Sequence, residues 1–545
     1  MTSVAILGGG VGGLSAAHEL VDRGFDVTVY EALGEFGGKA RSIPVPGSAQ
    51  GNLKPLPGEH GFRFFPGFYK HVVDTMERIP SAPATAASHL VDATRVLLAQ
   101  AGAKNELIVP VKAPSNLNDV AIVLRFISDF GLRLGIKPWE IPIFGQRILT
   151  LLTSCDERRY EQWEQQSWWE FSLAEHLSEP YQKFLSDGLT RTLVAARARE
   201  ISARTGGLIL CQLLFDIARV GARADRVLDG PTSDVWITPW VTLLKKRGVE
   251  FKERRTVTHI ECKGHLITGV TVKHDGKVEP VDKDYYVSAI PVEDLVPLIT
   301  PAMTKADPEL AKLERLTTRW MTGAMYYLKR DVPLQRGHTI FIDSDWSLTA
   351  ISQAQFWQHV DLDGYGNGKV DGILSVDISE WERPSEVTGL TAKQSTEEQI
   401  LDEVWRQMKA HIDDGSLKDE DVVARFLDRA ITPFDPKKPK VAAKNSEPLL
   451  INTAGSWDDR PEAMTAIKNF FLASDFVRTY TDLATMEGAN EAARRAVNGI
   501  LDDAQSMASR CQLWKLHEPG ILAPLRKLDK LKWDLESPLR KLGLM

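Results

Sequence analysis

Three glycines near the amino terminus separate a short apolar segment from a helical pattern. Val4–Leu7 is uniformly apolar, which is typical of a buried parallel strand. Gly8, Gly10 and Gly13 follow at G-x-G-x-x-G spacing, and Leu14–Arg23 then repeats apolar residues at helical intervals. The segment therefore predicts a strand that turns through glycine directly into a helix.

The next residues complete a βαβ unit. Phe25–Tyr30 is a second apolar strand, and it ends at Glu31. Gly8 permits the tight turn, and Gly10 has no Cβ, so a pyrophosphate can approach the backbone at the positive end of the helix. Glu31 stands where a carboxylate can accept hydrogen bonds from ribose hydroxyls. Strand, glycines, helix, strand and acid in this order predict that the chain binds a dinucleotide.

A second glycine pair follows the acid. Gly37 and Gly38 precede Lys39 and Arg41, and together with Glu31 they give the pattern E-x5-G-G-x-x-x-S. This pattern resembles the flavin-containing amine oxidase and phytoene desaturase superfamily, whose members bind FAD. The resemblance implies that the glycine pair lies near FAD and that Lys39 or Arg41 helps to hold it.

The resemblance continues in later segments. It implies that the strand containing Val257 meets the adenine end of FAD, that Asp475 takes the ribityl or phosphate side, and that Met486-Glu487-Gly488 places a helix N-terminus at the isoalloxazine ring. Family members usually carry glycine before this aspartate, whereas this chain has Ser474. The full set of predicted FAD contacts is Gly8, Gly10, Val11, Gly12, Gly13, Glu31, Ala32, Gly37, Gly38, Lys39, Ala40, Arg41, Gly61, Phe62, Arg63, Val257, Asp475, Met486, Glu487 and Ala489.

The segment Gly58–Tyr69 is rich in glycine and aromatic residues. It resembles a loop that lies close to the flavin in plant-type phytoene and ζ-carotene desaturases. Its polar side chains Arg63, His60 and Glu59 are the candidate catalytic residues. Arg63 could stabilise developing charge, and His60 could accept a proton because its ordinary pKa lies near neutrality. The alternative, that all three hold the loop or FAD in place, stays open.

Composition limits the class of protein. A chain of 545 residues is too long for one hydrophobic core, so two or three domains are expected. A net charge of −7 gives no reason to expect nucleic acid. The four cysteines are far apart, so neither a metal site nor a disulfide framework is expected. Because the glycine motif begins so near Met1, and no run of about 18 apolar residues occurs, we expect a cytoplasmic protein.

The expected fold class is α/β, with a Rossmann-like FAD-binding domain built from discontinuous segments and a mixed-sheet and helical substrate domain. Strands are expected at Leu348–Ser352 and Gly372–Ile378, and a helix at Asn490–Ile500. The expected FAD-binding segments are residues 1–115, 229–300 and 441–503; residues 116–228 form a helical region facing substrate or membrane, 301–440 the substrate domain, and 504–545 a basic amphipathic tail.

The chain is similar to plant-type phytoene and ζ-carotene desaturases and to bacterial hydroxysqualene dehydroxylase-like proteins. This similarity implies an FAD-dependent oxidoreductase that transfers hydride from a long isoprenoid or carotenoid-type hydrocarbon to flavin. Such a substrate has no polar handle, so its binding must come from apolar burial. Three alternatives stay open: an amine or amino-acid oxidase that uses O2, a flavin-dependent carotenoid isomerase, and a non-catalytic FAD-bound scaffold.

A hydrocarbon substrate resides in membranes, so we expect peripheral contact with a membrane surface. Two segments are candidates for this contact: Val120–Leu152, which is rich in apolar residues, and Leu513–Met545, which mixes leucines and Trp533 with lysines and arginines. A tail that docks on its own domain is the alternative for the second segment. The sequence leaves the oligomeric state open.

Overall fold

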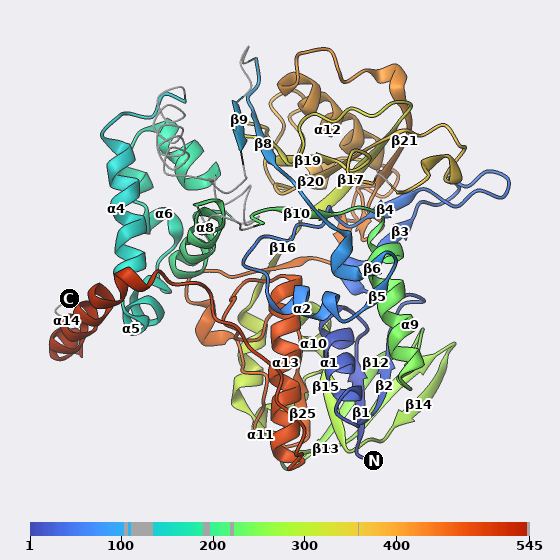
Figure 1. Ribbon diagram of the computed structural model, residues 1–545, viewed down its shortest axis with the longest axis vertical. Helices are drawn as coiled ribbons and strands as arrows, with labels where there is room; N and C mark the ends of the chain where they lie inside the picture. The colour runs from blue at the N-terminus through green and yellow to red at the C-terminus, as the bar shows by residue number, and fades with distance from the viewer. Residues whose placement is uncertain (103–106, 111–133, 189–196, 219–222, 358, 542–545) are drawn as a thin grey trace.

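The structure is a computed structural model of the chain (Figure 1). It describes residues 1–545 except 103–106, 111–133, 189–196, 219–222, 358 and 542–545. The described part consists of a parallel sheet with its helices, a larger mixed sheet, and a separate group of helices beside which the C-terminal helix lies (Figure 1). The candidate site is built where the first two of these parts meet.

Five parallel strands form the sheet of the first domain. Their order is β11 (Glu250–Lys252), β2 (Asp26–Tyr30), β1 (Ser3–Leu7), β15 (Tyr285–Ser288) and β25 (Phe470–Leu472). The central strand β1 is buried from Val4 to Leu7, which explains its uninterrupted apolar sequence. The strands come from distant parts of the chain, and the expected Rossmann-like α/β class is confirmed.

Helices pack on this parallel sheet. They are α1 (Val11–Val21), α9 (Thr238–Lys246) and α13 (Met486–Asp503), and α2 (His71–Glu77) packs against α13 (Figure 1). A separate antiparallel sheet follows β11 in the chain and consists of β12 (Thr256–Lys263), β13 (Leu266–His274) and β14 (Lys277–Val281).

A seven-stranded mixed sheet forms the second domain. Its order is β21 (Val422–Leu427), β17 (Thr322–Leu328), β20 (Gly372–Ile378), β19 (Leu348–Ser352), β18 (Thr339–Phe341), β8 (Arg95–Ala99) and β9 (Leu107–Pro110). One face shares an apolar core with α12 (Glu397–His411), and the opposite face is turned toward the first domain. Strands β8 and β9 show that the segment 1–115 contributes to both sheets.

The third part is helical. It contains α4 (Glu140–Thr153), α5 (Asp156–Arg158), α6 (Trp168–Phe171) and α8 (Ala203–Ala218), with several tryptophans in its core. The C-terminal helix α14 (Ala523–Lys541) docks on α4 and α5. Most of the apolar segment before α4, residues 111–133, lies outside the described residues.

Short elements connect these parts. They are β3 (Ser42–Pro44) with β4 (Pro57–Glu59), β5 (Pro80–Ser81) with β6 (Ala84–Thr85), β7 (Leu90–Asp92) with β10 (Arg226–Leu228), β16 (Thr317–Arg319) with β24 (Leu449–Ile451), β22 (Ile431–Thr432) with β23 (Lys444–Asn445), and the helices α10 (Val292–Leu295) and α11 (Pro301–Ala306).

Glu487, in the first turn of α13, fastens α2 to α13. Its fully buried carboxylate accepts hydrogen bonds from the backbone N–H groups of Lys70, His71 and Val72 at 2.7–2.8 Å, and it lies 2.8 Å from His71 Nδ1. Burial acts to raise the pKa of Glu487, but the His71 ring and these N–H groups outweigh it and hold the pKa below its usual value. The carboxylate therefore serves as the cap of α2.

We predict that Glu487→Gln lowers the free energy of unfolding by about 1–3 kcal/mol at pH 7, because an amide NH2 replaces an oxygen that faces N–H donors. The folded-state pKa is depressed, so this stabilisation is present above the ordinary glutamate pKa of about 4.3 and is lost as the pH falls below it. Thermal unfolding of wild type and variant at several pH values measures the difference in their free energies of unfolding. Glu386→Gln, at a glutamate that is 82% exposed, is the matched control and should change little.

Candidate functional site

The glycine turn after β1 is closely packed against two neighbouring strand ends. Gly8 has φ +107°, and a Cβ added to it would lie 2.9 Å from Ala289 O. A Cβ on Gly12 would lie 2.0 Å from Ala473 O, and one on Gly13 would lie 1.9 Å from Gly8 O. Only glycine allows these backbones to approach so closely, so the motif is needed for the close packing of α1.

The start of α1 offers free N–H groups beside an acid. Gly10 is the N-cap of α1 and provides no side chain to cap it, so the first turn can bind an anion. Glu31, at the end of β2, is buried and accepts the N–H groups of Gly9 at 2.7 Å and Leu33 at 2.8 Å. Burial raises the pKa of Glu31, although those N–H groups oppose the shift.

The two glycine turns lie side by side. The N–H of Gly37 donates to Gly9 O at 2.9 Å, and a Cβ on Gly38 would lie 3.0 Å from Gly10 Cα. Val257 lies at the start of β12, two residues after Arg255, whose N–H donates to the backbone oxygen of Glu31 at 2.7 Å. The structure therefore gathers the first glycine turn, the acid, the second glycine pair and the Val257 strand at one edge of the parallel sheet.

The basic residues of the second glycine segment are paired. Lys39 Nζ lies 2.8 Å from Glu293 Oε1 and also donates to the carbonyl of Pro448. Arg41 forms an ion pair with Glu447 at 2.9 Å. The contacts with Glu447 and Pro448 join the glycine segment to the chain just before β24, and the contact with Glu293 joins it to α10.

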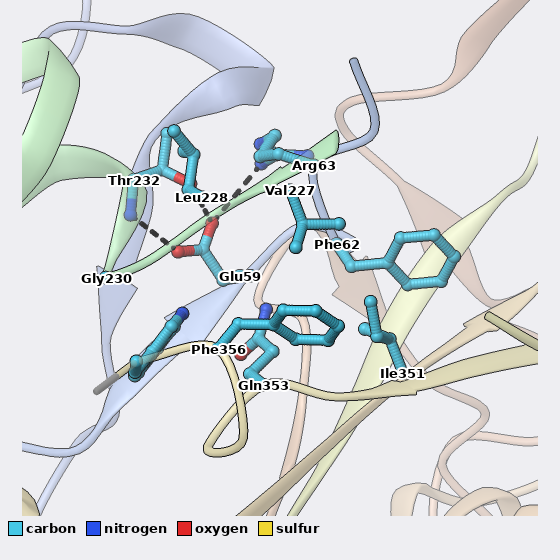
Figure 2. Close-up of a pocket in the computed structure, with 11 residues that line it drawn as sticks. Glu59, Phe62, Arg63, Val227, Leu228, Gly230, Thr232, Ile351, Gln353 and Phe356 are labelled. Atoms are coloured by element: carbon cyan, nitrogen blue, oxygen red, sulfur yellow. Dashed lines mark hydrogen bonds and ion pairs between the residues drawn. The ribbon is translucent and has the colours of Figure 1, made fainter. Parts of the chain in front are cut away.

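Glu59 and Arg63 come together on the aromatic loop. The buried carboxylate of Glu59 accepts hydrogen bonds from Ser42 Oγ at 2.8 Å and from the N–H and Oγ1 of Thr232, both at 3.1 Å. Arg63 lies 3.5 Å from Glu59 Oε2 and donates to Lys39 O at 2.8 Å (Figure 2). Burial raises the pKa of Glu59, and the Arg63 guanidinium opposes this. The pair thus holds the loop against the second glycine segment.

His60 points to a different neighbourhood. Its Nδ1 lies 2.5 Å from Asp428 Oδ2 and 3.8 Å from Glu447 Oε2. Its Nε2 is buried and has no hydrogen-bond partner among the described residues. The three candidate catalytic residues therefore split into the pair Glu59–Arg63 and a separate histidine–aspartate pair.

The backbone of the C-terminal motif lies at the glycine turn, whereas the side chain of Glu487 points to α2. The carbonyl groups of Ala473 and Ala489 lie beside Gly12, so this motif does meet the glycine turn. Asp475 follows β25 and lies 3.3 Å from Ser474 Oγ. The side chain of Glu487 caps α2, as described above, so any contact of this residue with FAD falls to its backbone.

A wall of apolar side chains lies next to the Glu59–Arg63 pair. It consists of Phe62, Val227, Leu228, Ile351, Phe356 and Trp357, and Figure 2 shows several of these groups facing one another across the loop. The space that they enclose is about 20 Å³, roughly the room for one water molecule. Sequence patterns did not single out these residues, because each belongs to a strand or turn far from the glycine motif.

A larger cleft of about 400 Å³ lies between the Gly34–Phe36 turn, the β3–β4 hairpin and α9. Its lining includes both acidic and basic side chains, among them Glu35, Asp234 and Lys245. A cleft lined with so many charges is poorly suited to an apolar chain.

Comparisons with known proteins give the family. The sequence model described as flavin containing amine oxidoreductase matches residues 11–501. The chain belongs to this family. It is 25% identical over 524 residues to a ζ-carotene desaturase of Synechocystis sp., which covers 91% of this chain and 97% of the relative. It is 24% identical over 527 residues to a 15-cis-phytoene desaturase of Synechococcus elongatus, covering 93% and 98%.

Solved structures share the fold. Cyclohexylamine oxidase from Brevibacterium oxydans IH-35A aligns with a TM-score of 0.59 at 14% identity and covers 92% of this chain and 99% of its own. The protein is thus an FAD-dependent oxidoreductase, and the expectations of FAD and of the superfamily are confirmed. The uncapped start of α1, the buried acid and the adjoining glycine pair fit the phosphates and ribose of this cofactor.

We predict that Gly10→Ala and Gly12→Ala behave differently. Gly10 has φ −74°, and its added Cβ would meet nothing closer than Gly38 Cα at 3.7 Å, so the fold should tolerate alanine while FAD binding weakens by about tenfold or more. Gly12→Ala should fail to fold, because its Cβ would lie 2.0 Å from Ala473 O. Unfolding temperature without cofactor and FAD titration by fluorescence measure the two effects. Equal FAD affinity in Gly10→Ala and wild type would contradict the predicted phosphate contact.

Proposed function

We propose that this oxidoreductase dehydrogenates a long isoprenoid or carotenoid-type hydrocarbon. The observation that carries the proposal is the apolar wall beside the aromatic loop; among the described residues that line this pocket, Glu59 and Arg63 are charged, and they lie 3.5 Å from each other. The chemistry of this lining suits a hydrocarbon, because binding then depends on apolar burial at about 25 cal/mol per Å². The enclosed space of about 20 Å³ must widen to admit one.

The similarity to carotenoid desaturases supports the same proposal. Two such relatives align over more than nine-tenths of this chain and of their own length. The aligned length exceeds 500 residues, so the likeness is not confined to the nucleotide-binding part. At about one-quarter identity it supports the substrate class.

FAD, when bound, accepts a hydride from a C–H bond, and the protein orients the reactants and excludes water. In this proposal the glycine turns and Glu31 hold the nucleotide, while the Val257 strand and Asp475 meet its adenine and ribityl regions. Arg63 supports the Lys39–Ala40 backbone next to the cofactor and supplies positive charge there.

We predict that anaerobic addition of an isoprenoid such as phytoene or ζ-carotene bleaches the flavin of the purified holoenzyme, whereas simple amines leave it oxidised. Arg63→Ala should slow this bleaching about 10- to 100-fold while FAD stays bound, because a positive charge near the cofactor is lost. Stopped-flow absorbance measures the rate, and the flavin-to-protein ratio serves as the control. Bleaching by amines alone, with peroxide release in air, would instead favour an amine oxidase.

We also propose that α14 gives this protein a peripheral contact with membranes. Leu525, Leu528, Leu531 and Leu535 recur every three or four residues along α14 and are 45–80% exposed. Lys532 lies on the same exposed side and can meet anionic headgroups. Among the described residues, no helix is long and apolar enough to cross a bilayer.

The opposite side of α14 is docked on the helical part of the chain. Arg158 forms ion pairs with Asp529 at 3.0 Å and Glu536 at 3.2 Å, and its guanidinium lies 4.7 Å from the ring centre of the buried Trp533. The tail therefore docks on the protein through its Asp529, Trp533 and Glu536 face, as the second of the two sequence-based alternatives has it. Docking by the polar and aromatic side leaves the leucines outward.

We predict that the triple variant Leu528→Ser, Leu531→Ser, Leu535→Ser loses flotation with anionic liposomes while its unfolding temperature changes little, because these side chains are exposed. Lys409→Ser, Lys438→Ser and Lys444→Ser together, on another part of the surface, are the control. Equal flotation of wild type and the leucine variant would exclude this face as the membrane contact.

A further inference from the structure

An acidic residue lies in the middle of the seven-stranded sheet. Asp377 is in β20, where it pairs with Gly323 of β17 and Thr349 of β19. Its neighbours Val376 and Ile378 point to the opposite face and belong to the core shared with α12. Asp377 therefore points toward the first domain, on the face that carries Ile351 of the apolar wall.

The aromatic loop lies directly over this carboxyl. The N–H of Gly323 donates to His60 O at 2.7 Å, which fixes the loop on the sheet. A Cβ added to Gly61 would lie 2.6 Å from Asp377 Oδ1. That oxygen is buried and has no hydrogen-bond partner among the described residues. The residue as a whole is partly exposed, although both neighbouring strands flank it.

The charged groups around Asp377 are Arg63 from the loop and His338 from the turn before β18. Burial raises the pKa of Asp377 to about 7, although Arg63, His338 and the N–H of Phe62 oppose the shift. His338 Nε2 lies 3.0 Å from Asp225 Oδ2, and this partner raises the pKa of His338 against the effect of burial. The flanking strands present no titratable side chain at the paired positions Gly323 and Thr349.

We propose that Asp377 is the catalytic residue that takes up the proton released when a substrate beside the Phe62–Arg63 loop is dehydrogenated. This inference rests on the proposed function. Forming a C=C bond removes a hydride from one carbon, which oxidised FAD accepts, and a proton from the neighbouring carbon. The electron pair of the second C–H bond becomes the π bond, and the carboxylate of Asp377 becomes a carboxylic acid.

Three features suit Asp377 to this role. Its free oxygen is not already committed to a hydrogen bond, in contrast to the carboxylate of Glu59. A buried carboxyl that titrates near neutral pH can both accept a proton from the substrate and release it afterwards. The sheet also fixes its backbone on both sides, so the acceptor has a defined position.

Anaerobic single-turnover reduction of the bound flavin by an isoprenoid tests the role. In wild type the rate should rise with pH through about 7, as the carboxyl ionises. Asp377→Asn should be about 10²- to 10⁴-fold slower and lose this pH dependence, and Asp377→Glu should restore part of both. Asp331→Asn is the matched control: burial also raises the pKa of Asp331, but its carboxylate accepts a hydrogen bond from Ser352 Oγ at 2.7 Å beyond the other end of β20. It should keep the wild-type rate and profile.

A second readout needs no substrate. The folded-state pKa of Asp377 is raised, so wild type should lose stability relative to Asp377→Asn as the pH rises from about 4 to about 7, and the difference should stay constant above that. Thermal unfolding across this range measures it. If the difference in stability between the two proteins does not change with pH, the assignment of a neutral buried carboxyl is wrong, and the acceptor role falls with it.

The outcomes separate the two proposals. If Asp377→Asn reduces its flavin at the wild-type rate with the wild-type pH profile, the acceptor role is wrong and the proposed function stands. If no isoprenoid reduces the flavin of wild type, the proposed function is wrong and the acceptor role falls with it.

Discussion

The close approach of three backbones at the first glycine turn is the constraint on which the site depends. Gly8 lies against Ala289 after β15, and Gly12 against Ala473 after β25. These contacts set the position of α1 and bring the C-terminal segment to the same edge of the sheet. The glycine turn expected to bind the phosphates and the motif expected near the flavin ring are therefore placed by one packing arrangement, and a single Cβ at Gly12 would disturb both.

Local patterns could be predicted from the sequence. The βαβ unit was predicted correctly, because strand, turn, helix and acid occupy one short continuous segment. The strands Leu348–Ser352 and Gly372–Ile378 were predicted with the bounds that the structure gives them, since their apolar sequences match buried strands. Helix α13 begins at Met486, where the resemblance implies a helix N-terminus, and it extends beyond both ends of the helix expected at Asn490–Ile500. Thr485 is its N-cap, and Thr485 Oγ1 accepts the N–H of Gly488.

Contacts between distant segments could not be predicted. The partner of Arg41, Glu447, lies in a loop with no recognisable pattern. Asp377 is the one acidic residue in the otherwise largely apolar strand β20. An acid at a buried strand position indicates a function other than core packing. Its position under Gly61 depends on how two domains meet, and no periodicity in either segment contains that information.

Helix α14 docks on the protein through its polar and aromatic face and not through its row of leucines. A surface helix normally buries its apolar face in the protein and leaves its charges in water. Here Arg158 holds α14 through carboxylates and Trp533, so folding uses the polar and aromatic side and leaves the leucines available. Exposed leucines contribute little to the stability of the fold, and a contiguous row of them on one helix face is typical of a surface that meets another apolar phase. A membrane supplies such a phase, and the long hydrocarbon that we propose as substrate would dissolve there.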